Sequence, residues 1–138
     1  MIIQTQTTSF KKELYEGIHD LLTDTIKIAL YTAFATLNAD TTAYSSTDEV
    51  VGTGYAAGGN ILTGATVKTY GSIVYVSFDN ASWPGATLTS RGALLYNASK
   101  ANRSIAVLNF GSDKVVTNQT ITVTMPTDTP TTALIRME

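Results

Sequence analysis

The chain contains no cysteine, which excludes disulfide bonds and every metal site built on thiolate ligands. His19 is the only histidine among 138 residues, so a zinc site with several histidine ligands is excluded as well. Charged residues make up only 14% of the chain, and the net charge of -2 offers no basic surface for nucleic acid. We therefore expect no metal, no cofactor and no nucleic-acid partner.

Long apolar runs are also missing. No stretch approaches the about 20 apolar residues that span a membrane. Residues 1–14 (MIIQTQTTSFKKEL) lack the basic region followed by an apolar core that marks a secretion signal. We expect a single domain that is made in the cytoplasm and has no membrane partner.

The strongest pattern lies in residues 87–111 (TLTSRGALLYNASKANRSIAVLNFG). Two apolar runs, residues 93–96 and 105–108, flank a polar octet that is rich in turn-favouring residues. Short apolar runs between turn signals indicate buried strands, and the octet interrupts the stripe that a helix would need. The sequence predicts a β-hairpin at the centre of an antiparallel sheet.

One helix is predicted near the start of the chain, over residues 9–22, with Ser9 as its N-terminal cap. Its apolar residues recur at spacings of three and four, which places them on one face: Phe10, Leu14, Ile18, Leu21 and Leu22. Gly17 weakens the middle of this segment, so we expect the helix to end near Gly17 or to kink there.

Further strands are predicted where apolar residues alternate or cluster between turn residues: 25–32, 61–67, 72–78, 120–126 and 132–137. Turns are predicted at residues 70–71, 84–85 and 128–130, and a polar loop at 112–118. This count predicts a mainly β fold, an antiparallel two-sheet sandwich of about seven or eight strands with one short N-terminal helix. A closed barrel is the alternative. We divide the chain into an N-terminal arm, residues 1–8, and a single β-sandwich domain, residues 9–138.

Residues 1–8 are β-prone and carry Ile2 and Ile3. This segment is either a frayed terminus or an arm that pairs with the sheet edge of a neighbouring subunit. Trp83, the only tryptophan, precedes a Pro-Gly turn, where it can plug the core or anchor an interface. We favour the plug and keep Ile2, Ile3 and Trp83 as candidate contact residues.

Residues 33–60 form a long irregular stretch, longer than a structureless loop in a compact domain should be. It must hold short pieces of structure or make contacts of its own. Four glycines bracket Tyr55 and indicate an exposed tyrosine on a sharply turning backbone. With Tyr44 it can form a contact surface, and a plain surface loop is the alternative.

Catalytic groups are sparse. His19 lies on the predicted helix, and no Gly-x-Ser-x-Gly motif accompanies it. Asp48 and Glu49 are the only adjacent acidic residues, and no calcium-ligand spacing surrounds them. We therefore expect no enzymatic activity.

Three stretches together resemble a family of small virion structural proteins of tailed bacteriophages: SFKKELYEGIHDLLTDTIKIALYT, EVVGTGYAAGGNILTG, and LTSRGALLYN followed by AVLNFG. Members of this family are described as head decoration, cement or tail-associated proteins, and the likeness covers nearly the whole chain. The resemblance implies a β-rich, non-enzymatic domain that is located in the virion.

From this resemblance we expect a capsid decoration or cement protein that binds the major capsid protein, stabilises the head and forms a homo-oligomer. The alternative is a tail, neck or fibre-associated protein that touches the host through the Gly/Tyr loop. A third hypothesis is a carbohydrate-binding module or a glycan hydrolase, because sandwich folds host both.

Overall fold

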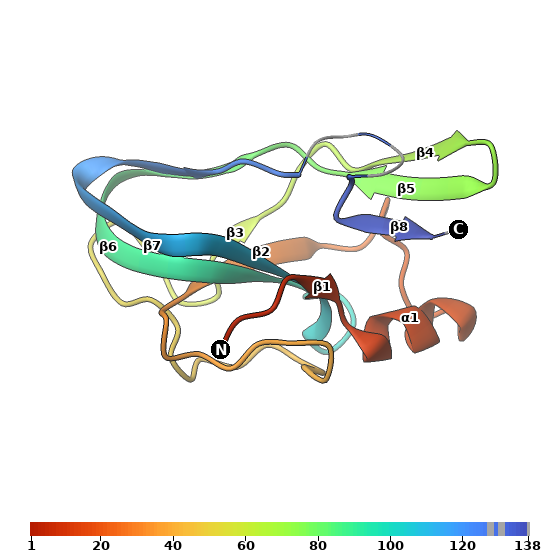
Figure 1. The fold of residues 1–138 in the computed structure, drawn as a ribbon, viewed down its shortest axis with the longest axis horizontal. Helices are drawn as coiled ribbons and strands as arrows, with labels where there is room; N and C mark the ends of the chain where they lie inside the picture. Colours follow the sequence, from red (N-terminus) through yellow and green to blue (C-terminus); the bar gives the residue numbers. More distant parts are fainter. Residues whose placement is uncertain (127–128, 130–131, 138) are drawn as a thin grey trace.

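The computed structural model describes residues 1–126, 129 and 132–137. The described residues form, in chain order, β1 Thr5–Gln6, α1 Thr8–Tyr15, β2 Ile26–Tyr31, β3 Asn60–Ile61, β4 Thr66–Tyr70, β5 Ile73–Ser77, β6 Ala81–Asn97, β7 Arg103–Val123 and β8 Ile135–Met137. They build two antiparallel sheets, β1-β7-β6-β2-β3 and β4-β5-β8 (Figure 1). The predicted fold class is confirmed. The turn predicted at residues 128–130 falls largely outside the described residues.

The predicted central hairpin is the hairpin of β6 and β7. Leu94 lies opposite Val107 and Ala93 opposite Leu108, and both predicted apolar runs are at most 4% exposed. These strands are buried on both faces, so their apolar runs are continuous instead of alternating.

Both strands are longer than the sequence predicts. The polar loop expected at residues 112–118 belongs to β7, and the turn expected at residues 84–85 lies inside β6. The ladder shifts register between Trp83 and Ala86, and Gly85 has a φ of 61° there. The turn residues therefore form a β-bulge, which bends a strand without ending it.

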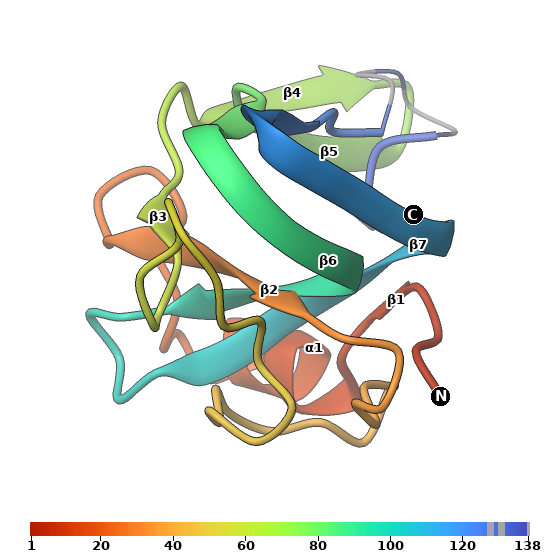
Figure 2. The ribbon, with the colours of Figure 1, turned by 90° about the vertical axis from the view of Figure 1, so that its left-hand side faces the viewer.

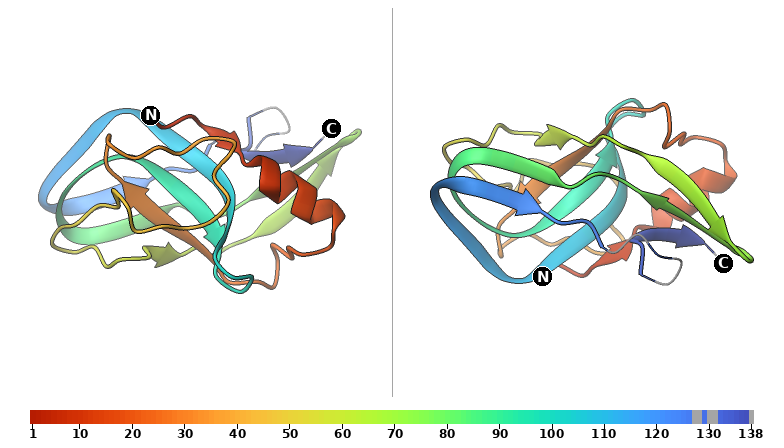
Figure 3. Two further views of the ribbon diagram at one scale, coloured as in Figure 1. Left: turned by 90° about the horizontal axis from the view of Figure 1, so that it is seen from below. Right: turned by 90° about the horizontal axis from the view of Figure 1, so that it is seen from above.

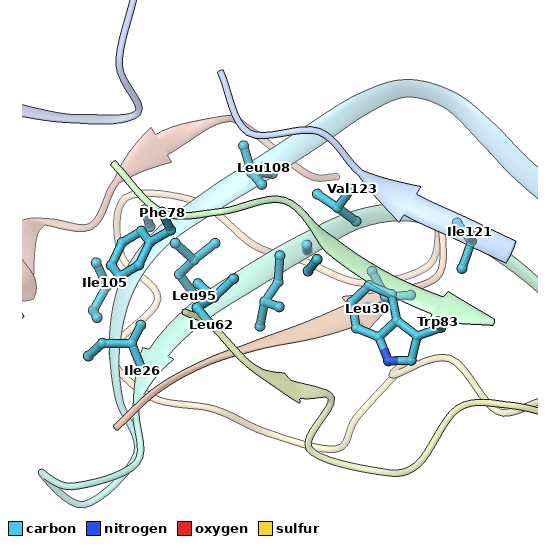
Figure 4. Close-up of a cluster of buried hydrophobic side chains, with 14 of the residues drawn as sticks. Ile26, Leu30, Leu62, Phe78, Trp83, Leu95, Ile105, Leu108, Ile121 and Val123 are labelled. Carbon is cyan, nitrogen blue, oxygen red and sulfur yellow. The ribbon is translucent and has the colours of Figure 1, made fainter. Parts of the chain in front are cut away.

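The β6–β7 ribbon folds back on itself, as its curved course in Figure 2 shows. In Figure 1 it turns at the left and returns along the top. The main core fills the space between its two arms (Figure 4). Its residues come from both arms, from β2 and from neighbouring segments, and include Ile26, Leu30, Leu62, Phe78, Trp83, Leu95, Ile105, Leu108, Ile121 and Val123.

A second buried cluster lies on the other face of the larger sheet, beneath residues 33–60. It comprises Ile2, Ala29, Tyr31, Ala35, Leu37, Leu94, Tyr96 and Val107. Figure 3 (left) shows the long irregular segment crossing this face. The prediction that this segment makes contacts of its own is confirmed.

The helix α1 begins one residue earlier and ends sooner than the predicted range. Thr7, not Ser9, is the cap, and its Oγ1 accepts a hydrogen bond of 3.3 Å from the Phe10 N–H. Gly17 has a φ of 72°, and the helix ends before it, as predicted. Leu22 is 58% exposed, so its assignment to the buried apolar stripe is wrong.

The N-terminal arm lies against the sheet of its own chain. Thr5 pairs with Val107 in β7, Ile2 is 5% exposed, and the Met1 ammonium donates to the Ala35 carbonyl at 3.0 Å. In this structure the arm is therefore neither frayed nor free to reach a neighbouring subunit.

The smaller sheet projects beyond the core. β4 and β5 form a hairpin through the corner predicted at Tyr70 and Gly71. β5 pairs in turn with β8, within the last strand that the sequence predicts. The strand predicted at residues 61–67 is divided between β3 and β4. Among the described residues, no helix has the length and apolar character needed to cross a membrane.

Candidate functional site

The five predicted contact residues do not gather on one surface. Trp83 is 3% exposed and plugs the core (Figure 4), and Ile2 is also buried, whereas Ile3 is 49% exposed. Tyr44 and Tyr55 are only partly exposed, and each packs against a buried cluster. The expectation of an exposed Tyr55 is wrong, because its hydroxyl points inward.

That hydroxyl belongs to a network around the buried carboxylate of Glu49. Tyr44 and Tyr55 each donate to Glu49 at 2.6 Å, and the Gly58 N–H donates to it at 2.8 Å. The Tyr55 hydroxyl also accepts from the Leu30 N–H at 2.9 Å. These bonds satisfy the buried charge and fasten the long segment to β2.

The phenols of this network remain protonated over the ordinary pH range. Burial, reinforced by hydrogen bonds to the Glu49 carboxylate, raises the pKa of Tyr44 and of Tyr55 far above the usual range. The Tyr44 ring also stacks on Tyr96, with centroids 4.7 Å apart. Sequence reasoning considered Glu49 only as a calcium ligand. Tyr44, five residues upstream of it, and Tyr55, six residues downstream, gave no periodic signal.

His19 is held in a second polar cluster. Its side chain is fully buried, Nε2 lies 2.9 Å from Glu13 Oε1, and Nδ1 lies 3.0 Å from the Asn97 amide nitrogen. The Asn97 amide donates to Nδ1, so Nε2 carries the proton that is donated to Glu13. Among the described residues no hydroxyl hydrogen-bonds to His19.

Charged side chains tie the tip of the β6–β7 hairpin to α1 and to the segment after it. Asp24 accepts from the Asn97 amide at 2.8 Å and from Lys100 at 3.0 Å, while Arg103 lies 3.3 Å from Glu13. Burial opposes ionisation of Asp24, but these hydrogen bonds outweigh it and lower its pKa to about 2. The cluster acts as a structural clamp.

An apolar cleft of about 490 Å³ lies between the smaller sheet and the end of the helical region. We call it the small-sheet cleft. Its apolar lining is Leu14, Leu21, Leu22, Val67, Val74, Val76, Ile135 and Met137, and Gln6, Gly17, His19, Asp20 and Arg136 complete its wall. Figure 1 shows the smaller sheet extending above α1.

The cleft walls are open to solvent. Val67 is 46% exposed, Val74 is 40% exposed and Met137 is 41% exposed. The ladder pairs Val67 with Val76 and Val74 with Met137, so these side chains share one face of the smaller sheet. Sequence reasoning missed this face, because each strand is short and its apolar residues are few.

A second groove, of about 810 Å³, lies along β7 between its two arms. We call it the β7 groove. Its apolar lining is Leu108, Phe110, Val115, Val116, Ile121, Val123 and Pro126, and Gln4 of the N-terminal arm closes one side.

No family model, curated protein or solved structure matches the chain. Within the described part of the chain, no three histidine or acidic side chains stand close enough together to hold a metal ion.

Proposed function

We propose that the chain is a structural protein of a tailed-phage virion, a head decoration or cement protein that binds the major capsid protein. The observation that carries the proposal is the small-sheet cleft, an open apolar surface whose floor is continuous with the main core through Leu21 and Ile135. The three stretches that resemble the phage family support the virion as its location.

The cleft has the composition of the centre of a protein interface. Interface centres are apolar and depleted of charge, with polar groups at the rim. Here valine, leucine, isoleucine and methionine side chains form the walls, while Asp20 and Arg136 supply opposite charges beside them. An apolar segment of the capsid protein would remove this surface from water. Each side chain of Val or Leu size that becomes fully buried contributes about 1.5–3 kcal/mol.

The carboxylate of Glu49 and the imidazole of His19 are already hydrogen-bonded within the chain, although His19 also lines the small-sheet cleft. Their contacts hold segments of this protein together, and this supports a role for the chain as a rigid body that presents surface.

The test compares Val74→Glu with Tyr70→Glu on the same hairpin. Val74 faces the cleft, whereas Tyr70 is 70% exposed, is absent from the cleft lining and lies at the hairpin corner. Each purified variant is mixed with particles that lack the protein, and the bound copies are counted after sedimentation. We expect Val74→Glu to lose binding at least about tenfold, because a carboxylate placed in an apolar interface loses its hydration. Tyr70→Glu should bind like the unaltered chain.

Copy number tests the location. A head decoration protein should be present in numbers comparable to the capsomers, and labelled protein should cover the head in electron micrographs. A few copies confined to the tail would replace this assignment with a tail-associated one. Equal binding by Val74→Glu and the unaltered chain would remove the cleft from the proposal.

A further inference from the structure

The edges of the two sheets differ in how they are protected. The smaller sheet ends in β4, five residues with Lys68 at its middle, and in β8, which has three residues. Short edge strands and lysine on an edge both oppose pairing with another chain. In the larger sheet, β3 is a two-residue edge strand beside β2.

The outer edge of β7 has no such charge after Lys114. β1 covers β7 only at Ala106 and Val107, so among the described residues β6 is the only strand paired with the rest of β7. After Asp113 and Lys114, no charged residue occurs before Pro126. Such an edge is uncharged, rich in Val, Ile and Thr, and predicted to pair with another strand.

One part of this edge is regular enough to accept a strand. The register shifts near residues 117–118, where Asn118 has a φ of 50°, and the ladder is regular again from Ile121 to Val123. Residues 120–124 alternate strictly. Ile121 and Val123 are buried, and Thr120, Thr122 and Thr124 are exposed. This segment also forms one wall of the β7 groove, so an added strand would contact the apolar lining of that groove.

We infer that residues 120–124 of β7 pair antiparallel with the same residues of a second copy of this chain, about a two-fold axis. We choose a second copy as the partner because the segment is uncharged. When it pairs with itself, no like charges lie opposite each other. Asp113 and Lys114 both lie outside the paired residues. Between residues 115 and 126, a charged partner strand would find no complementary charge.

The pleat restricts the register. Residues that lie opposite each other in a sheet point to the same face, so buried residues must face buried residues. The two-fold axis therefore passes through a residue. With Thr122 on the axis, Ile121 faces the partner's Val123, and Thr120 faces the partner's Thr124. This arrangement joins the larger sheets of the two copies into one sheet, and the paired residues include none that line the small-sheet cleft.

The absence of native cysteine permits a clean test. In the Thr122→Cys variant the two new thiols lie opposite each other, within the about 4.5–5.5 Å between Cβ atoms that cross-strand pairs show. Mild oxidation should give a disulfide-linked dimer. The control is Thr69→Cys on β4, at an exposed position of the protected edge, which should stay monomeric on a non-reducing gel.

A charge at the axis gives the complementary measurement. Thr122→Lys places two ammonium groups opposite each other, and we expect it to weaken dimerisation at least about tenfold in sedimentation velocity. Thr69→Lys should leave dimerisation unchanged. Circular dichroism checks that both variants are folded.

A chain that is monomeric up to millimolar concentration would overturn the inference, as would an unchanged dimer in Thr122→Lys. Failure of the Thr122→Cys cross-link would reject the register with Thr122 on the axis. These outcomes leave the capsid proposal standing, because binding through the small-sheet cleft is measured separately with Val74→Glu.

Discussion

The network around Glu49 allows two similar substitutions to be compared. Tyr55→Phe and Tyr44→Phe each remove one hydroxyl that donates to the same carboxylate at 2.6 Å. The two hydroxyls differ in one respect. The Tyr55 hydroxyl also accepts from the Leu30 N–H at 2.9 Å, so its loss leaves a backbone donor of β2 without that acceptor.

The expected magnitudes follow from this difference. A hydrogen bond to a charged group contributes about 1.5–3 kcal/mol, and a buried unsatisfied donor costs about 1–3 kcal/mol. Tyr44→Phe loses only the first contribution and keeps the ring that stacks on Tyr96, so we expect a loss of about 2 kcal/mol. Tyr55→Phe loses both contributions, so we expect a loss of about 3–4 kcal/mol. Both variants should remain folded if the unaltered chain has an ordinary stability of about 5–15 kcal/mol.

Urea unfolding at neutral pH measures both losses. The fluorescence of Trp83, whose ring centroid lies 5.9 Å from that of Tyr55, reports on the core, and far-ultraviolet circular dichroism gives an independent transition. Hydrogen exchange adds a local check. The Leu30 amide should exchange faster in Tyr55→Phe than in the unaltered chain, and its exchange rate should be unchanged in Tyr44→Phe. A loss in Tyr44→Phe that equals or exceeds the loss in Tyr55→Phe would refute the assigned hydrogen bonds.

Three further predictions concern stability. The Trp83 indole N–H is buried without a partner in the described chain. Trp83→Phe should therefore change the unfolding free energy by less than about 1 kcal/mol, whereas Trp83→Ala should lose about 3–5 kcal/mol. A large loss in the phenylalanine variant would mean that the N–H is hydrogen-bonded. In Gly59→Ala the new Cβ would lie 1.8 Å from a carbonyl oxygen of β2 at a φ of 76°, so we expect no folded protein. Gly17→Ala, with a φ of 72° and open space, should lose only about 1 kcal/mol in thermal unfolding, and equal effects of the two substitutions would contradict the packing. The pKa of Asp24 is lowered in the folded chain from 3.8 to about 2, so the stability that its ionised form contributes is complete above pH 4 and is lost as the pH falls toward 2. Acid titration of the unfolding midpoint should therefore be shallower in Asp24→Asn over that range, and identical curves would exclude this contribution.

The sequence predicts the parts of the fold whose burial is periodic. The apolar runs at residues 93–96 and 105–108 form the centre of the ribbon, and the alternation over residues 120–126 places Ile121 and Val123 inside with threonines outside. In these segments local preference and tertiary burial agree, which is the condition under which pattern reasoning succeeds.

The sequence does not predict how far those strands extend. Residues 112–118 look like a loop because nearly all of them are exposed, and an exposed edge strand carries no apolar period. Pro84 and Gly85 have turn chemistry, but the partner strand continues past them, so the chain forms a bulge instead of a reversal. The deciding contacts come from residues far away along the chain.

The candidate surfaces are harder still to predict. The glycines around Tyr55 correctly indicate sharp backbone turns, but they do not reveal that the side chain turns toward Glu49. The small-sheet cleft combines residues from the N-terminal region, from β4 and β5 and from β8. No local pattern joins segments separated by a hundred residues, so this surface becomes visible only in the folded chain.

The doubled-back ribbon also affects how the protein would tolerate changes in length. Both arms of the ribbon that enclose the core belong to one hairpin. An extra residue at its tip, within residues 98–102, therefore lengthens a loop and keeps the β6–β7 pairing in register. One residue more or less beside Gly85 would instead shift the register of the returning arm by one residue, which exchanges its two faces and turns Trp83 toward solvent. Grafted peptides therefore belong at the tip, and the bend is the position where an insertion mutant would fail.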